Sequence, residues 1–230
     1  MGNKQSQQNK VGHLETMSAD ELQAYEEKCR ADPGRILNNQ RCYLGLDLAS
    51  ESGFLGANES LYEVVQRDHA YVTGRLGPLG HDKIAFWLSS LSAVCHKRNE
   101  DADRIQATDE YLEQQGHAPQ AAQWLAELRI DQFEGTSTTY GGNQSCPFWK
   151  RVQAIDKDGK PLFTESGTPE MDDALHGCQG GVDYVVWRRD QPDVRFVFCA
   201  LNVMMIRYHH FYEGSVPHRV DPAAFLAFLK

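Results

Sequence analysis

The residues best suited to chemistry lie near the end of the chain, where histidines, aromatic residues and an acid follow one another. His209 and His210 stand in the sequence YHHFYEG, and Glu213 comes three residues after His210. Imidazole and carboxyl groups held together in an apolar setting can exchange protons with a substrate, which makes these residues candidates for a general acid and base. A structural interpretation is favoured over this one, because histidines stabilise the C-terminal end of a helix and Gly214 is a common helix stop.

Metal ligands of the zinc type gather in the same part of the chain. They are Cys146, His176, Cys178, Cys199, His209, His210 and His218. Zinc prefers four such nitrogen and sulfur ligands in a tetrahedron, but no two of these residues have the C-x-x-C or H-x3-H spacing of known zinc sites. The nearest approach is His176-Gly177-Cys178, while His209 and His210 would point about 100° apart on a helix. A zinc site would therefore have to be assembled by the fold, with His176, Cys178 and His209 as the candidate ligands.

A hydrolase that uses a cysteine nucleophile is a further alternative. Cys146 or Cys178 would attack the substrate, and His210 would accept the proton, since such partners meet in space and not in sequence. Asp47 is a third candidate catalytic residue, beside Cys146 and Cys178, that could lie near His210. It stands on an expected strand that leads into a Ser/Gly-rich loop. No local sequence signature marks either cysteine as catalytic.

The first residues of the chain match a lipidation pattern. Gly2 and Ser6 fit M-G-x-x-x-[ST], the signal for N-myristoylation. One acyl chain gives only weak membrane binding, and Lys4 and Lys10 add little positive charge to support it. Residues 1–17 are polar and are expected to form a disordered tail.

Composition excludes several classes of function. The net charge is -9, and no basic stripe is present, which argues against nucleic acid as a partner. The sequence contains no run of 18 apolar residues, which is about the length needed to span a membrane. It therefore predicts membrane contact only through an acyl chain on Gly2. Because the first residues lack the apolar core of a secretory signal, the six cysteines are expected to be reduced in a cytoplasmic protein.

Helices are expected to dominate residues 18–131. Ser18 and Glu21 form a capping box that opens a first helix. Apolar residues at helical spacing predict further helices over 58–73, from His81 to Cys95, and from Pro119 onward. One strand is expected within this part, because apolar and other residues alternate over 42–48.

Strands are expected to dominate residues 146–230. The polar stretch 133–145, FEGTSTTYGGNQS, reads as a loop. A hairpin is predicted from VDYVVWRR and VRFVFCA with a turn at DQPD. A short helix is predicted over 201–211, with a continuation of the preceding strand as the alternative, because periodicity separates the two poorly in so apolar a run. Asp221 and Pro222 predict the start of a terminal helix.

These patterns predict a single α+β domain over residues 18–230, in which an N-terminal helical layer packs on a mainly antiparallel sheet from the C-terminal half. Because no complete catalytic or cofactor motif is present, the first functional hypothesis is a non-enzymatic cytosolic binding or adaptor protein with a protein partner and no cofactor. The alternative is a small hydrolase or metalloenzyme that uses the C-terminal histidine, glutamate and cysteine residues, with zinc as the metal.

Overall fold

The structure, a computed structural model, describes residues 13–31, 53–56, 58–95, 118–148, 152–153, 171–172 and 179–230. In chain order, its elements are η1 (Leu14–Thr16), α1 (Ala19–Ala31), α2 (Leu61–Leu76), α3 (Gly80–Cys95), α5 (Ala118–Leu128), η3 (Ile130–Gln132), β1 (Phe133–Ser145), β2 (Val152–Gln153), β3 (Met171–Asp172), β4 (Gln179–Arg188), β5 (Gln191–Cys199), α6 (Ala200–His209) and α7 (Pro222–Phe228).

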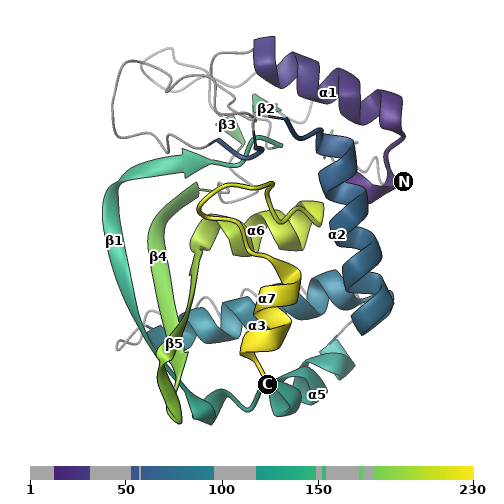
Figure 1. The fold of residues 1–230 in the computed structure, drawn as a ribbon. Helices are drawn as coiled ribbons and strands as arrows, with labels where there is room; N and C mark the ends of the chain where they lie inside the picture. Colours follow the sequence, from purple (N-terminus) through teal and green to yellow (C-terminus); the bar gives the residue numbers. More distant parts are fainter. Residues whose placement is uncertain are drawn as a thin grey trace, which may run out of the picture.

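The predicted α+β class is confirmed. Strands β1, β4 and β5, all from the C-terminal half, form an antiparallel sheet in the order β1-β4-β5. Figure 1 shows the helices gathered on one side of this sheet. The helical layer is not only N-terminal, because α6 packs on β4 and α7 packs on β5, next to the contacts that α3 makes with β1 and β4.

Strand β1 replaces the loop predicted over 133–145, so that prediction was wrong. Among the strands that the structure describes, β1 is at the edge of the sheet and pairs only with β4. Its outward side chains, such as those of Glu134 and Thr136, are exposed, while Phe133 is buried. A strand with one solvated face can be rich in polar residues. The prediction relied on apolar patterns, so it did not recognise β1 as a strand. Gly135 allows α3 to come close, because a Cβ there would lie 2.4 Å from the Sγ atom of Cys95.

The predicted hairpin of β4 and β5 is confirmed, with its turn two residues early. The turn comprises Arg189 and Asp190, and β5 already begins at Gln191. Tyr184 and Val186 of β4 and Phe198 of β5 point into the core, in the alternation expected for a half-buried sheet.

Helix α6 explains why the C-terminal histidines are buried. Its residues join two apolar clusters: Val203 and Ile206 pack toward the sheet, α3 and α7, whereas Leu201 and Met205 pack toward η1, α1 and α2. The helix predicted over 201–211 is therefore present, but it ends at His209, before the predicted limit.

The capping signals place the other helices as expected. Glu21 accepts hydrogen bonds from the backbone N–H of Ser18 at 2.8 Å, and the Ser18 hydroxyl accepts one from the backbone N–H of Glu21 at 3.3 Å, which is the predicted capping box. Asp221 accepts a hydrogen bond from the backbone N–H of Ala224 at 2.8 Å, with Pro222 as the first residue of α7.

The N-terminal boundary differs from the prediction. Residues 13–17 belong to the folded part, because Leu14 is fully buried and η1 contacts α2. The predicted strand over 42–48 lies outside the described residues, and so do Gly2, Asp47, His176 and Cys178. Among the helices that the structure describes, none is both long and apolar enough to cross a bilayer.

Candidate functional site

The end of α6 carries His210 into a cluster of imidazole rings. The residue adopts a left-handed backbone conformation, with φ 54° and ψ 35°, and this conformation ends the helix. Left-handed backbone is unusual for residues with a Cβ, and such strain is often found at functional sites. The His210 side chain is 7% exposed, so its ring is held by neighbouring groups and not by water.

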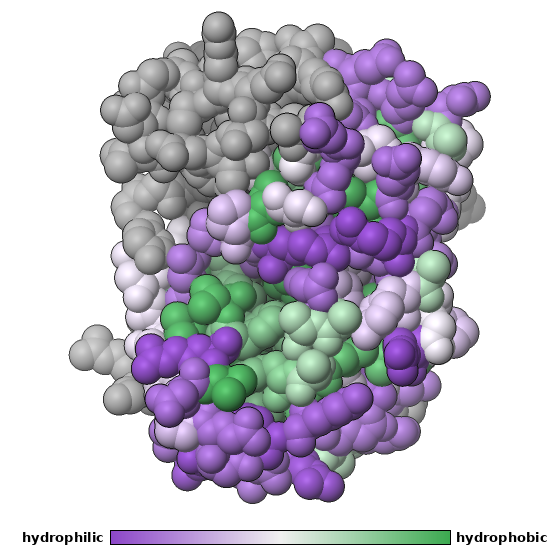
Figure 2. Space-filling model, in the orientation of Figure 1, coloured by the Kyte–Doolittle hydropathy of each residue, from purple (hydrophilic) through white to green (hydrophobic). Residues whose placement is uncertain are grey.

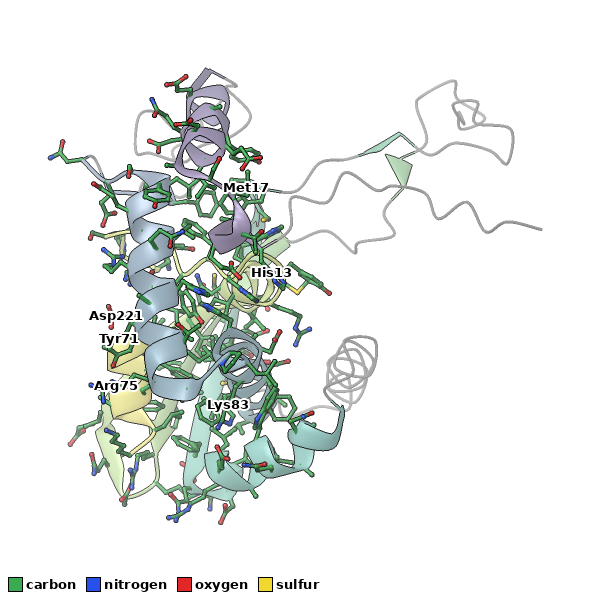
Figure 3. The ribbon with its side chains drawn as sticks, turned by 90° about the vertical axis from the view of Figure 1, so that its right-hand side faces the viewer. His13, Met17, Tyr71, Arg75, Lys83 and Asp221 are labelled. Carbon is green, nitrogen blue, oxygen red and sulfur yellow. The ribbon has the colours of Figure 1, made fainter. Side chains whose placement is uncertain are left out.

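Two of these neighbours come from the first described residues of the chain. The carboxylate of Glu15, on η1, lies 2.7 Å from the Nδ1 atom of His210, across 195 residues of sequence. The ring of His13 stacks on that of His210, with 3.7 Å between centroids and 23° between planes. Leu14 lies between His13 and Glu15 in the sequence. Its side chain is fully buried and anchors this segment to the core. Figure 3 shows His13 beside α6.

Two further histidines lie on the other side of His210. The ring of His81, at the start of α3, stacks on His210 with 4.1 Å between centroids and 12° between planes. The Nε2 atom of His81 lies 3.0 Å from the Nδ1 atom of His69 on α2. Its Nδ1 atom lies 3.0 Å from the hydroxyl of Tyr212. The cluster therefore joins η1, α2, α3 and the segment that follows α6.

Burial and mutual repulsion keep two of the rings neutral. Burial, followed by the charge of His210, lowers the pKa of His81 from 6.5 to about 3. The same two causes lower the pKa of His13, although Glu15 acts against them. Burial opposes ionisation of Glu15, but its hydrogen bond to His210 and the charge of that ring outweigh this effect, and the pKa of Glu15 is lowered. At neutral pH the cluster thus offers neutral rings at His13 and His81 and an ionised carboxylate at Glu15.

His13, Glu15 and His210 are placed so that they could share one metal ion. One possible ligand atom from each lies within 4.8 Å of the other two. Two buried atoms, Oε2 of Glu15 and Nε2 of His210, have no hydrogen-bond partner among the described residues. Buried polar atoms are nearly always paired, so each of these two atoms is a place where a water molecule or a ligand could bind.

The other sequence-predicted residues do not join this cluster. Glu213 is buried elsewhere, where its Oε1 atom accepts a hydrogen bond from Asn202 at 2.9 Å. Cys146 is buried in the apolar cluster of η1, α1 and α2. The ring of His209 packs on Phe148, with 5.2 Å between centroids.

Glu213 has a different kind of environment from the histidine cluster. Burial raises its pKa from 4.5 to about 8, although the hydrogen bond from Asn202 and the charge of Arg219 act against this. Arg219 forms its main ion pair with Asp68, at 2.7 Å, and also donates to the backbone carbonyl of Glu213. The predicted pairing of Glu213 with histidine as an acid and base is not seen.

Sequence reasoning missed His13, Glu15, His69, His81 and Tyr212. The pattern His13-Leu14-Glu15, two polar ligands around one apolar anchor, was the available signal. His69 and Tyr212 carried no signal of their own, because each stands in a helix or aromatic run that reads as ordinary packing.

Comparison with known proteins assigns no residue a role: no protein-family model, no curated protein and no solved structure matches this chain.

Proposed function

We propose that this protein binds a divalent metal ion of the zinc class through His13, Glu15 and His210, and uses it to activate water for hydrolysis. The observation that carries the proposal is the convergence of these three side chains, with one ligand atom from each within 4.8 Å of the others. The unpaired Oε2 of Glu15 supports it.

The ligand set suits a catalytic ion better than a structural one. Structural zinc sites usually have four protein ligands, whereas catalytic sites combine three, such as two histidines and a carboxylate, with a water molecule. An ion in such a site lowers the pKa of its bound water to about 7 and acts as a Lewis acid on the substrate. Neutral His13 and ionised Glu15 are the forms that bind metal, so their lowered pKa values favour binding at neutral pH.

One local rearrangement is expected when the ion binds. The rings of His13 and His210 are stacked, so their in-plane lone pairs lie side by side and cannot both point at one ion. His13 is the ring with room to turn, because its side chain is 40% exposed whereas that of His210 is 7% exposed. We therefore expect His13 to swing, and the proton shared between Nδ1 of His210 and Glu15 to be released as the ion replaces their hydrogen bond.

Metal analysis tests the proposal. Wild-type protein, stripped with a chelator and dialysed against zinc or cobalt(II), should retain one ion per chain. His13→Ala, Glu15→Gln and His210→Ala should each bind at least tenfold more weakly. His218→Ala removes an exposed histidine and is the matched control, expected to bind like wild type. Hydrolysis of a panel of ester and phosphoester substrates should depend on the ion.

The proposal fails if folded wild-type protein retains less than about one tenth of an equivalent of either ion. It also fails if His210→Ala and His218→Ala bind the ion equally, since binding would then occur elsewhere. Binding without hydrolysis would leave a metal site and remove the catalytic part of the proposal.

Protein binding, the first hypothesis from the sequence, is a second candidate because of a surface groove beside α7. The groove measures about 480 Å³, and its lining includes Trp87, Leu76 and Leu226 together with Arg75 and Lys230. Figure 2 shows apolar surface gathered on this face of the molecule. A groove lined mainly by apolar side chains can receive the apolar face of a partner helix. Leu226→Asp should abolish binding of any partner that uses it, measured with the purified partner by calorimetry.

A further inference from the structure

The hydroxyl of Tyr212 has one hydrogen-bond acceptor among the described residues, the Nδ1 atom of His81 at 3.0 Å. Tyr212 is 1% exposed, and its phenol hydroxyl carries a proton at neutral pH, as phenols ordinarily do. A buried hydroxyl proton needs an acceptor. The hydroxyl of Tyr212 therefore donates to Nδ1 of His81.

This donation decides where the proton of His81 lies. A neutral imidazole carries one proton, so a ring that accepts at Nδ1 carries it on Nε2. Nε2 of His81 faces Nδ1 of His69 at 3.0 Å and donates to it. His69, accepting at Nδ1, then has its own proton on Nε2. The direction of each hydrogen bond follows from the one before it, from Tyr212 through His81 to His69.

We infer that this one-directional chain holds His81 in place and that His81, through ring stacking, positions His210 as a metal ligand. The inference rests on the proposed metal site. The ring of His81 cannot turn without breaking a hydrogen bond at each of its nitrogens. Its face lies 4.1 Å from that of His210, whose other face is covered by His13. His81 and Tyr212 are thus positioning residues, because neither contributes a ligand atom to the group of three.

Nuclear magnetic resonance tests the chain without metal. In ¹⁵N-labelled protein at neutral pH, His81 should show an unprotonated Nδ1 and a protonated Nε2, and His69 the same tautomer. The opposite tautomer of His81, with its proton on Nδ1, would overturn the inference whatever the metal does.

Tyr212→Phe tests the positioning role. The substitution removes only the hydroxyl, and we expect zinc affinity to fall about tenfold, as is usual when a residue that orients a ligand is lost. The visible absorption spectrum of the cobalt(II) form should also change, because that spectrum reports ligand geometry. Tyr184→Phe, which removes a buried hydroxyl in the sheet, is the control for a general loss of stability and should leave affinity and spectrum unchanged.

Failure of this inference and failure of the proposed function give different results. If wild-type protein binds zinc and Tyr212→Phe binds it equally well with the same cobalt spectrum, the positioning role is wrong and the metal site stands. If wild-type protein binds no metal, both fail.

Discussion

Replacing Glu213 with glutamine should make the protein more stable at alkaline pH. Glu213 is 3% exposed, and Asn202 donates a hydrogen bond to its Oε1 atom at 2.9 Å. Burial raises the pKa of its carboxyl from 4.5 to about 8. Folding therefore keeps a proton on a group that would release it in water, and this makes stability depend on pH.

The sign and size follow from the two pKa values. Below pH 4.5 the carboxyl is protonated in both the folded and the unfolded protein, so its ionisation does not lower the stability. Between pH 4.5 and 8 only the unfolded state releases the proton, so stability falls as pH rises, by about 1.4 kcal/mol per pH unit. The loss reaches about 4 kcal/mol at pH 8. Glutamine has a similar shape, can still accept from Asn202 and does not ionise, so Glu213→Gln should not show this loss.

Urea unfolding at pH 5, 6, 7 and 8, followed by tryptophan fluorescence, measures the effect. The difference between variant and wild type is the useful quantity, because contributions shared by both proteins cancel. One of these is His81, whose lowered pKa makes stability fall as pH drops below 6.5, the opposite slope. We expect the free energies of unfolding of the two proteins to agree within about 1 kcal/mol at pH 5, and that of the variant to be about 4 kcal/mol higher at pH 8.

Glu59→Gln is the matched control. Burial acts to raise the pKa of Glu59, but hydrogen bonds from the backbone N–H groups of Ser215 and Gly56 lower it overall. The pKa of Glu59 therefore lies below its ordinary value of 4.5, and its variant should differ from wild type by a nearly constant amount from pH 5 to 8. Should Glu213→Gln also run parallel to wild type over this range, the raised pKa of Glu213 and the reasoning behind it are refuted.

Two other substitutions test the packing around the site by the same unfolding measurement. Gly214→Ala would place a Cβ 2.0 Å from Oε2 of Glu59, and the resulting displacement should cost about 1–3 kcal/mol; an unchanged midpoint would show that the two segments are not in contact. Arg219→Ala removes the bidentate partner of Asp68, which is 3% exposed, and should cost about 3 kcal/mol. Arg188→Ala breaks a pair whose acid, Asp190, is 59% exposed and should have little effect; equal losses in the two arginine variants would contradict the importance of burying the acid.

Much of the fold could be predicted because its signals are local. Capping residues such as Ser18 and Asp221 act within one turn of their own helix, and the alternation in β4 and β5 reflects one buried face. The polar strand β1 could not be predicted, because its place in the sheet depends on pairing with β4, about 50 residues away. Its own composition resembles that of a loop.

The candidate site was predicted only in part, for a similar reason. His210 was identified from its aromatic neighbours, and Glu213 was identified with it. The two residues are three positions apart, but the left-handed conformation of His210 sends them into different surroundings. Glu213 meets Asn202, whereas His210 meets Glu15.

By itself the sequence determined most of the helices, the hairpin of β4 and β5, the α+β class and the apolar surroundings of the C-terminal histidines, because these depend on local propensity and on apolar pattern. Only the tertiary structure decided the partners of His210. Its carboxylate comes from 195 residues away, and its stacking rings come from segments that look like a polar tail and an ordinary helix start. Side chains so distant in sequence meet only because α6 is buried on all sides and η1, α2 and α3 pack around it. The chemistry of the site is therefore set by packing between elements and not by any motif within one of them.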